Sequence, residues 1–299
     1  MRWRRRRSGN VYRLPRLADG VKTSEALGGA VDALAAVGVE DPRLDAEILL
    51  CEATGWGRAD LAADPGRGVP PPAGRRFGEM VRRRLRREPV AYIVGRKGFR
   101  HIELAVDRRV LVPRPETELL VELALELRPR RLLDVGTGSG AIALAAAHEL
   151  PECEVTATDT SAAALEVARA NAERLGLAER VRFVEGSSPG DEMDGTAGGF
   201  DLVLANLPYV SEPEWRGLQP EVTEWEPREA LLAGADGLDA IRATIPGMSE
   251  LAPTLALEVG QGQAETVAAM LRDARFDAVE TRRDLAGIER VVVGRRQAR

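Results

Sequence analysis

From Arg131 towards the end of the chain, strand-like and helix-like segments alternate. The strand-like segments are "RLLDVG", "EVTATD", "VRFVEG", "FDLVLAN", "TLALEVG" and "RVVVG", and segments with helical spacing such as "GAIALAAAHEL" and "SAAALEVARANAERLG" lie between them. Because neighbouring parallel strands are joined by crossovers that are usually helical, this order predicts an α/β fold with a parallel sheet covered by helices on both faces. Such sheets bind ligands at the carboxyl ends of their strands.

The segment before this alternation has helical patterns without strands between them. Helical spacing predicts a helix from about residue 23, with Thr23 or Ser24 as its N-cap and Gly38 at its end. Asp41 and the proline after it predict the capped start of a second helix. Residues 23–90 are therefore expected to form a small domain of packed helices.

A further helical pattern covers residues 73–88, after a stretch rich in Gly and Pro, residues 65–72, that predicts a loop. Five arginines lie within residues 82–87, and we expect the arginines of this helix to lie mostly on its solvated face, with a basic docking surface as the less favoured alternative. The apolar face would consist of Phe77, Met80, Val81 and Leu85.

Between the helical and the alternating regions, short β-prone runs interrupted by Gly95 predict a hairpin. A helix is expected to begin after Pro115, with Glu116 and Glu118 in its first turn, where the helix dipole favours acids. The stretch "RPETE", Arg114 to Glu118, is either an ordinary helix start or part of the wall of a ligand cleft. We favour a structural role with partial contact with the cleft.

Composition excludes several classes of function. The net charge is −5, so the chain as a whole is not a polyanion binder. All but two of its 42 basic residues are arginines, a bias that makes any single arginine weak evidence for phosphate binding. Residues 1–22 hold a cluster of arginines without the apolar region of a secretory signal. We interpret them as a flexible basic tail, with a nucleic-acid-binding arm as the less favoured alternative.

Cysteine and histidine are scarce. Cys51 and Cys153, together with His101 and His148, are too isolated to give the ligand spacing of a metal site. A Ser/His/Asp hydrolase would need one of these histidines, and neither lies in a suggestive context. No apolar run is long enough to span a membrane. We therefore expect a cytoplasmic protein without a metal.

A glycine loop follows the first strand of the alternating region. In "LLDVGTGSGAIALAAA", Gly136, Gly138 and Gly140 allow a sharp turn and a close approach of a ligand to the backbone. Asp159 ends the next strand, where a carboxylate can accept hydrogen bonds from both hydroxyls of a ribose. This strand–helix–strand unit predicts a nucleoside cofactor, with NAD and S-adenosylmethionine both open.

Asp134 helps to choose between these cofactors. It lies at the end of the strand, two residues before the first glycine. A carboxylate there suits a positively charged cofactor or the polar hydrogens of the loop, and it is unfavourable beside a pyrophosphate. S-adenosylmethionine carries a sulfonium and an ammonium group and no phosphate, so the electrostatics favour it.

The strand-like run "DLVLAN" ends at the polar Asn206, and Leu207, Pro208 and Tyr209 follow it. Asn and Pro are common in turns, so an ordinary strand-ending turn is one interpretation. Such a turn does not require a tyrosine. The alternative is a binding site, because the carboxyl end of a central parallel strand is where ligands are held.

Taken together, "DVGTGSGAIAL", "ATD" and "NLPY" resemble the class I S-adenosylmethionine-dependent methyltransferases that methylate amino groups, whose signature is Asn-Pro-Pro-Tyr. The stretches "VAYIVGRKGF", "LVPRPETELLVE" and "EVTEWEPREALLAGADGLDAIR" further resemble the release-factor glutamine methyltransferases, the HemK/PrmC family. The resemblance covers about residues 23–295, and "RPETE" combined with the glycine loop and N-x-P-Y is its most specific part.

The resemblance implies a seven-stranded, mostly parallel, doubly wound Rossmann-like catalytic domain at residues 114–299. It further implies a β-hairpin linker at residues 91–113 and a helical-bundle domain for substrate recognition at residues 23–90. The implied reaction moves a methyl group from S-adenosylmethionine to the side-chain amide nitrogen, N5, of the glutamine in the Gly-Gly-Gln motif of class I peptide chain release factors. Direct binding of nucleic acid or membrane is not expected.

Carried over by position, the resemblance implies two groups of site residues. The cofactor contacts would be Gly136, Thr137, Gly138, Ser139, Gly140, Asp159, Ser187, Ser188 and Asn206. The catalytic and substrate-binding residues would be Asn206, Leu207, Pro208 and Tyr209. The Asn206 side-chain oxygen and the Leu207 carbonyl would each accept one hydrogen of the substrate amide, and Tyr209 would pack against its plane. Leu207 stands where the family has its first proline, so Asn206 lacks the backbone restriction that a following proline imposes.

Other functions stay open on these residues. A glutamine in a ribosomal protein or an adenine in DNA are alternative acceptors. A DNA enzyme needs a target-reading region and a basic cleft, whereas this chain has a net charge of −5 and a small helical domain, so a protein substrate fits better. A nicotinamide dehydrogenase does not explain N-x-P-Y. The non-enzymatic alternative is a binding module that lost turnover, with Leu207 as its sign.

Overall fold

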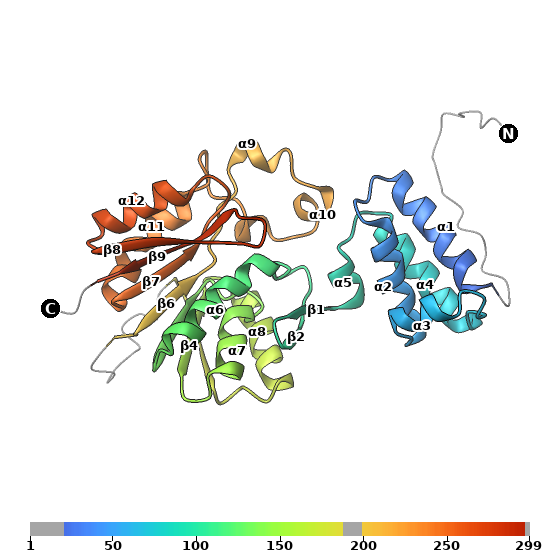
Figure 1. Ribbon diagram of the computed structural model, residues 1–299, viewed down its shortest axis with the longest axis horizontal. Coiled ribbons are helices and arrows are strands. Elements are labelled where there is room, and N and C mark those ends of the chain that lie inside the picture. Colours follow the sequence, from blue (N-terminus) through green and yellow to red (C-terminus); the bar gives the residue numbers. More distant parts are fainter. Residues whose placement is uncertain (1–20, 188–198, 297–299) are drawn as a thin grey trace. The chain divides into compact units, whose positions relative to one another are not determined.

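The computed structural model describes residues 21–187 and 199–296 of the chain (Figure 1). The chain divides into two units, Met1–Val94 and Gly95–Arg299. The predicted basic tail, residues 1–22, lies outside the described residues except for its last two. Within the described ranges, no helix is long and apolar enough to cross a membrane.

The first unit is helical, as predicted. Its helices are α1 (Thr23–Ala36), α2 (Pro42–Thr54), α3 (Arg58–Ala63), α4 (Pro71–Arg84) and α5 (Val90–Val94). Their apolar faces meet in one core, in which Leu34, Leu49 and Leu50 are fully buried. Phe77 and Val81 of α4 join this core, so the predicted apolar face of that helix is confirmed.

Three predicted helix starts differ in detail from the structure. Lys22, not Thr23, occupies the N-cap position of α1, and the Thr23 hydroxyl donates to the Arg67 carbonyl at 2.9 Å. Asp41 lies at the N-cap of α2, but its side chain makes no capping hydrogen bond. Pro71 begins α4 inside the stretch predicted to be a loop. A proline suits that first turn because its missing N–H needs no partner there.

Most arginines of α4 are exposed, as expected, but Arg84 is an exception. Arg84 is buried, and its Nε lies 2.6 Å from Asp45 Oδ2, so this ion pair joins α4 to α2. The Arg83 Nε donates to Glu88 at 2.8 Å. Arginine tolerates burial here because its charge is paired and its hydrogens have acceptors.

The second unit begins with the predicted hairpin, formed by the antiparallel strands β1 (Arg96–Phe99) and β2 (Ile102–Ala105). The hairpin is shorter than its strand-like pattern suggested, because α5 takes up residues 90–94. The Pro89 carbonyl accepts the first backbone hydrogen bonds of that helical turn. Further on, the "RPETE" stretch forms the helical turn η1 (Pro115–Thr117) and leads into α6 (Glu118–Leu127).

A seven-stranded sheet in the order β5-β4-β3-β6-β7-β9-β8 forms the centre of the second unit. Its strands are β3 (Arg131–Val135), β4 (Glu154–Asp159), β5 (Val181–Glu185), β6 (Leu202–Ala205), β7 (Thr254–Glu258), β8 (Ala278–Arg283) and β9 (Glu289–Arg295). The pairs among β3 to β7 are parallel, and β9 is antiparallel to both β7 and β8. This confirms the predicted seven-stranded, mostly parallel fold. The strand order reverses between β3 and β6, which is where such sheets bind ligands.

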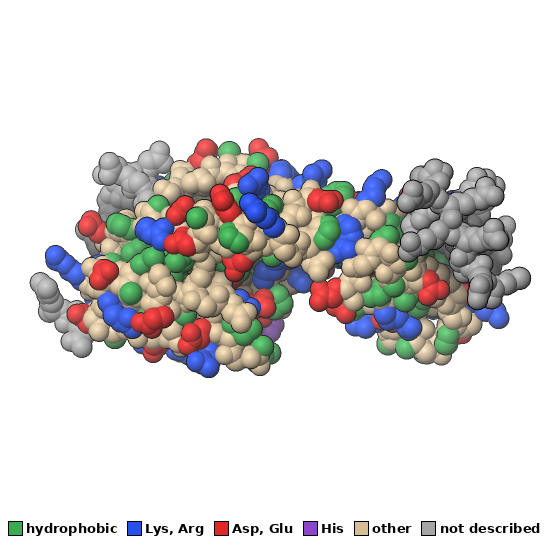
Figure 2. All heavy atoms as spheres, turned by 90° about the horizontal axis from the view of Figure 1, so that it is seen from above, with side chains coloured by type: hydrophobic (Ala, Val, Ile, Leu, Met, Phe, Trp, Pro, Cys, Tyr) green, Lys and Arg blue, Asp and Glu red, His purple; other side chains and the backbone are tan. Residues whose placement is uncertain are grey.

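Helices cover both faces of the sheet (Figure 1). One face carries α6, α7 (Ala141–Glu149) and α8 (Ala162–Arg174), and the other carries α11 (Asp239–Leu251) and α12 (Ala264–Asp273). The apolar sides of α11 and α12 pack on Val203, Leu255 and Leu257 of the sheet. The short elements α9 (Glu212–Trp215), α10 (Pro220–Thr223) and η2 (Arg228–Ala230) connect β6 to α11. On the face seen in Figure 2, acidic and basic side chains are interspersed rather than gathered by sign.

Candidate active site

A cavity of about 280 Å³ lies at the carboxyl ends of the central strands, inside the second unit. Predicted site residues reach it from the loop after β3, the end of β4, the turn after β5 and the segment after β6. Those that line it are Gly136, Gly138, Asp159, Ser187, Asn206, Leu207 and Pro208. Parallel strands bring these distant segments together because their carboxyl ends share one edge of the sheet.

The other predicted residues that the structure describes do not line this cavity. Thr137 and Ser139 are buried in the glycine loop, and Gly140 is the N-cap of α7. Tyr209 follows the lining segment, and its hydroxyl donates a hydrogen bond to the Glu258 carboxylate. Ser188 lies outside the described residues, so its predicted contact stays a prediction.

The glycine loop requires glycine for two separate reasons. Gly136 has a φ of 75°, a left-handed conformation that side chains rarely adopt, and a Cβ there would meet Leu207 Cδ2 at 3.3 Å. Gly140 has a φ of 85°, and a Cβ there would meet Leu144 Cδ1 at 2.7 Å. Gly136 therefore also makes room for the leucine that replaces the family's proline.

Asp134 is fully buried beneath this loop. Its Oδ2 accepts hydrogen bonds from the Thr137 hydroxyl at 2.6 Å and from the Ala143 amide at 3.1 Å. Burial raises the pKa of Asp134 to about 7, and the nearby charge of Asp159 adds to this effect, while the two hydrogen bonds oppose it. Of the two roles that the sequence suggested for Asp134, the structure shows the binding of the loop's polar hydrogens.

Asp159 ends β4 at the edge of the cavity. Its Oδ2 accepts from the Gly138 amide and its Oδ1 from the Ser161 amide, each at 2.9 Å. Since each carboxylate oxygen has a second lone pair, both can still accept a hydroxyl hydrogen. The two backbone hydrogen bonds fix the carboxylate in a position from which it can hold a ribose.

Asn206 follows β6 and lines the cavity. Its side-chain Nδ2 donates to the Thr117 hydroxyl at 3.0 Å. This contact joins the N-x-P-Y segment to the "RPETE" stretch, for which we expected partial contact with the cleft. Thr117 itself was not among the predicted site residues.

Leu207 is 8% exposed and belongs to the core shared with α11 and α12. Its side chain packs over Gly136 and forms part of the cavity wall. The leucine therefore supplies apolar contact area where the family has a proline ring.

Tyr209 is held at both ends. Its hydroxyl donates to Glu258 Oε1 at 3.1 Å, and its carbonyl accepts from Gln263 Nε2 at 2.9 Å. Burial raises the pKa of Tyr209 well above its usual range, and the charge of Glu258 adds to the shift. Burial also raises the pKa of Glu258 to about 7, although the nearby Thr117 hydroxyl and the hydrogen bond from Tyr209 oppose the rise. Sequence patterns missed Glu258 because an acid at the end of β7 gives no motif.

An ion pair fastens the segment before α11 beside the cavity. Arg114 Nη2 lies 2.6 Å from Glu226 Oε1, and Glu226 Oε2 accepts from the Val112 amide at 3.2 Å. Pro227 and Ala230, just beyond Glu226, line the cavity. Arg114 and Thr117 both belong to "RPETE". This stretch therefore contacts the segment around Glu226 as well as Asn206.

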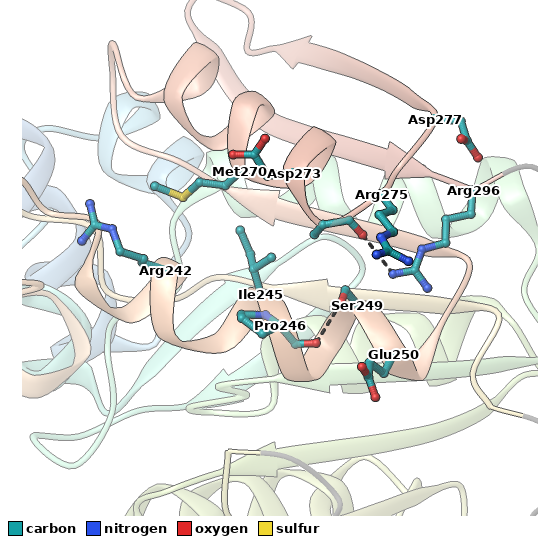
Figure 3. A pocket seen from close by; sticks show the side chains of 11 residues that line it. Arg242, Ile245, Pro246, Ser249, Glu250, Met270, Asp273, Arg275, Asp277 and Arg296 are labelled. Carbon is teal, nitrogen blue, oxygen red and sulfur yellow. Dashed lines mark hydrogen bonds between the residues drawn. The ribbon is translucent and has the colours of Figure 1, made fainter.

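A second hollow, of about 1260 Å³, lies between α11 and α12 and is lined by none of the predicted site residues (Figure 3). Arginines and acids both line it, and Figure 3 shows Arg275 and Arg296 beside each other at one end. The Arg296 Nη2 donates to the Ala274 carbonyl. The larger hollow is therefore not the candidate site, because the predicted site residues line the smaller cavity.

Comparison with known proteins identifies the family of the chain. Residues 25–95 match the family model of the PrmC N-terminal domain, and residues 132–225 match that of a methyltransferase domain. A release factor glutamine methyltransferase of Nitratidesulfovibrio vulgaris is 42% identical over 271 residues, covering 88% of this chain and 91% of the relative. One of Geobacter sulfurreducens is 42% identical over 270 residues, covering 88% of this chain and 92% of the relative.

Among solved structures, the hMettl16 catalytic domain in complex with a 3′UTR hairpin aligns with a TM-score of 0.50. Its sequence identity is 16%, and the alignment covers 65% of this chain and 76% of that one, so it supports the fold alone. The curated relatives decide the family, because they match over both units. The chain belongs to the release factor glutamine methyltransferase family of S-adenosylmethionine-dependent enzymes.

Proposed function

We propose that this protein transfers the methyl group of S-adenosylmethionine to N5 of the glutamine in the Gly-Gly-Gln motif of class I peptide chain release factors. The observation that carries the proposal is that Asn206 and Pro208 line the same cavity as the glycine loop and Asp159. An amide-binding segment beside a nucleoside-binding loop suits methyl transfer to an amide nitrogen.

The residues around the cavity fit the proposed cofactor. Gly136 leaves backbone exposed that a side chain would cover, Asp159 presents acceptors for a ribose, and the wall includes the apolar Leu207. We assign cofactor contacts to the predicted residues that line the cavity, and we assign to Thr137, Ser139 and Gly140 the shaping of the loop. Bound here, S-adenosylmethionine supplies an electrophilic methyl group on its sulfonium sulfur.

The chain's own task is to prepare a weak nucleophile. A carboxamide nitrogen reacts poorly because its lone pair is delocalised into the carbonyl. We assign to the Asn206 side-chain oxygen and the Leu207 carbonyl the acceptance of the two amide hydrogens, which leaves the lone pair free to point at the methyl group. Pro208 restricts the backbone of Leu207 and so helps to aim that carbonyl.

These hydrogen bonds strengthen as positive charge develops on the nitrogen, so they stabilise the transition state more than the ground state. Tyr209 would pack against the planar amide while Glu258 holds its hydroxyl. The proton of the product can leave to water after methyl transfer, so the step itself requires no general base.

We assign substrate recognition to the helical unit, supported by its own core and its match to a family-specific domain. The interspersed charges on the face seen in Figure 2 favour a protein over a nucleic acid as the partner. Release factors act in the cytoplasm, so the proposal places the enzyme there, and it requires neither a membrane nor a metal.

The test is methyl transfer from labelled S-adenosylmethionine to a purified class I release factor. We expect label on the factor and none on a variant whose Gly-Gly-Gln glutamine is alanine. Asn206→Ala in the enzyme should lower turnover by about 100-fold or more, while the affinity for S-adenosylmethionine and the melting temperature stay close to those of the parent. Label on the alanine variant, or on DNA alone, would overturn the proposal, and so would near-parental turnover of Asn206→Ala.

A further inference from the structure

We propose that Thr117 and Glu258 are positioning residues that hold the Asn206 amide in the one orientation that permits methyl transfer. The inference rests on the proposed function, because it gives the Asn206 oxygen the role of accepting a hydrogen of the substrate amide. Thr117 and Glu258 act through Asn206 and need not touch the substrate.

The three side chains come from different parts of the fold. Thr117 ends η1, Asn206 follows β6, and Glu258 ends the neighbouring strand β7. Asn206 Nδ2 donates to the Thr117 hydroxyl at 3.0 Å, and the same hydroxyl lies near enough to Glu258 to oppose the rise in the pKa of that carboxyl. Thr117 is 4% exposed and Glu258 is 1% exposed, so water does not replace these contacts easily.

The direction of the hydrogen bonds follows from the number of protons. A carboxylate only accepts, so the single hydroxyl proton of Thr117 is drawn towards Glu258. The Thr117 oxygen then faces Asn206 as an acceptor, and only the NH₂ end of that amide can satisfy it. Asn206 Oδ1 is thereby left for the cavity. If the Asn206 amide were rotated by 180°, its oxygen would face the Thr117 oxygen, and its NH₂ group would face the NH₂ group of the substrate glutamine. Neither pair could form a hydrogen bond.

Glu258 also fixes the position of the Tyr209 side chain, because the Tyr209 hydroxyl donates to Glu258 Oε1 at 3.1 Å. Its Oε2 is buried and has no hydrogen-bond partner among the described residues, so it is the oxygen that we assign as acceptor of the Thr117 proton. A buried carboxylate lowers stability unless its lone pairs are used, so a purely structural role is a poor explanation for its position. One carboxylate thus orients both polar ends of the N-x-P-Y segment.

The test compares turnover of Thr117→Val, Thr117→Ser and Glu258→Gln on a class I release factor at pH 8, where the Glu258 carboxylate is ionised. Valine keeps the shape of threonine without the hydroxyl, and we expect kcat to fall about 10- to 30-fold, the loss of one or two hydrogen bonds. Serine keeps the hydroxyl and should stay within about threefold of the parent. Glutamine at position 258 offers an NH₂ to Thr117 and should lower kcat as valine does.

Three further readouts separate positioning from general damage. KM for the factor and the affinity for S-adenosylmethionine should change less than about twofold in every variant. Thr156→Val, which alters a buried threonine in the middle of β4, is the matched control and should leave kcat unchanged. The Thr117→Val/Glu258→Gln double variant should be little slower than either single variant, because both break the same chain of hydrogen bonds.

The side-chain amide of Asn206 gives a readout that does not depend on turnover. In ¹⁵N spectra, the NH₂ signals that disappear in Asn206→Ala should exchange faster with water in Thr117→Val than in the parent or Thr117→Ser. If the parent fails to methylate the factor, the proposed function fails while this measurement still judges the inference. Equal losses in the valine and serine variants, multiplicative losses in the double variant, or unchanged amide exchange would each overturn it.

Discussion

The ion pair between Arg114 and Glu226 allows a quantitative prediction for Arg114→Met. Methionine keeps an apolar stem but removes the charge that lies 2.6 Å from Glu226. The Glu226 side chain is 2% exposed, so its carboxylate would lose its main compensating charge and retain only the hydrogen bond from the Val112 amide. The substitution therefore tests how firmly the segment before α11 is held against the cavity.

The magnitude follows from burial. Removing one partner of a buried ion pair typically costs about 3–5 kcal/mol. The Arg114 side chain is 32% exposed, so water already shares in its solvation and the loss should fall below that range. We expect the free energy of unfolding of the second unit to decrease by roughly 2–3 kcal/mol at pH 8.

The deficit should depend on pH. Burial raises the pKa of Glu226 even beside Arg114, and removal of the arginine raises it further. Between the ordinary carboxyl pKa of about 4 and this higher native value, the folded state binds a proton that the unfolded state has released, so stability falls as pH rises. The deficit of Arg114→Met should accordingly be smaller at pH 5 than at pH 8.

Urea denaturation at both pH values, followed by tryptophan fluorescence, gives the free energies. Without the Glu226 carboxyl there is no buried charge to titrate, so the deficit of the Arg114→Met/Glu226→Gln double variant relative to Glu226→Gln should be independent of pH. Because Pro227 and Ala230 line the cavity, S-adenosylmethionine should bind more weakly to Arg114→Met in calorimetric titrations. A deficit below about 1 kcal/mol at pH 8, within the range of an exposed pair, would refute the argument, as would equal deficits at the two pH values.

Two further predictions concern the cofactor loop and the leucine above it. Leu207→Pro should keep kcat within about threefold of the parent, because a proline also supplies the carbonyl. Leu207→Ala should lower the free energy of unfolding by about 2–4 kcal/mol, because the Leu207 side chain is buried. Labelled-methyl transfer and urea denaturation measure these effects, and a large loss of kcat in Leu207→Pro would argue against the carbonyl. The raised pKa of Asp134 should make the protein less stable as the pH rises from about 4 to about 7, and Asp134→Asn should remove this contribution. Melting temperatures measured across this pH range test the prediction. An unchanged pH dependence in the variant would contradict the raised pKa.

Local patterns in the sequence were sufficient for the fold class and for much of the site. The strands and helices after Arg131 follow from hydrophobic periodicity, and the glycine loop follows from backbone conformations that only glycine tolerates. Because the carboxyl ends of parallel strands share one edge, the sequence predicts that the loop, Asp159 and Asn206 lie near each other, and they line one cavity.

Tertiary structure decided the partners of these residues. Thr117 meets Asn206 across 89 residues, and Arg114 meets Glu226 across 112, so no periodic pattern connects them. The same limit explains why the sequence could not single out Arg84 as the buried arginine of its helix, since its partner Asp45 lies on another helix.

Periodicity reports only which face of an element is buried, because it arises from the geometry of one helix or strand. The choice of a polar partner depends on how separate elements pack, and that packing is a property of the whole folded chain. For this reason the sequence indicated Asn206 and the glycine loop, whereas only the folded structure revealed the side chains that contact them.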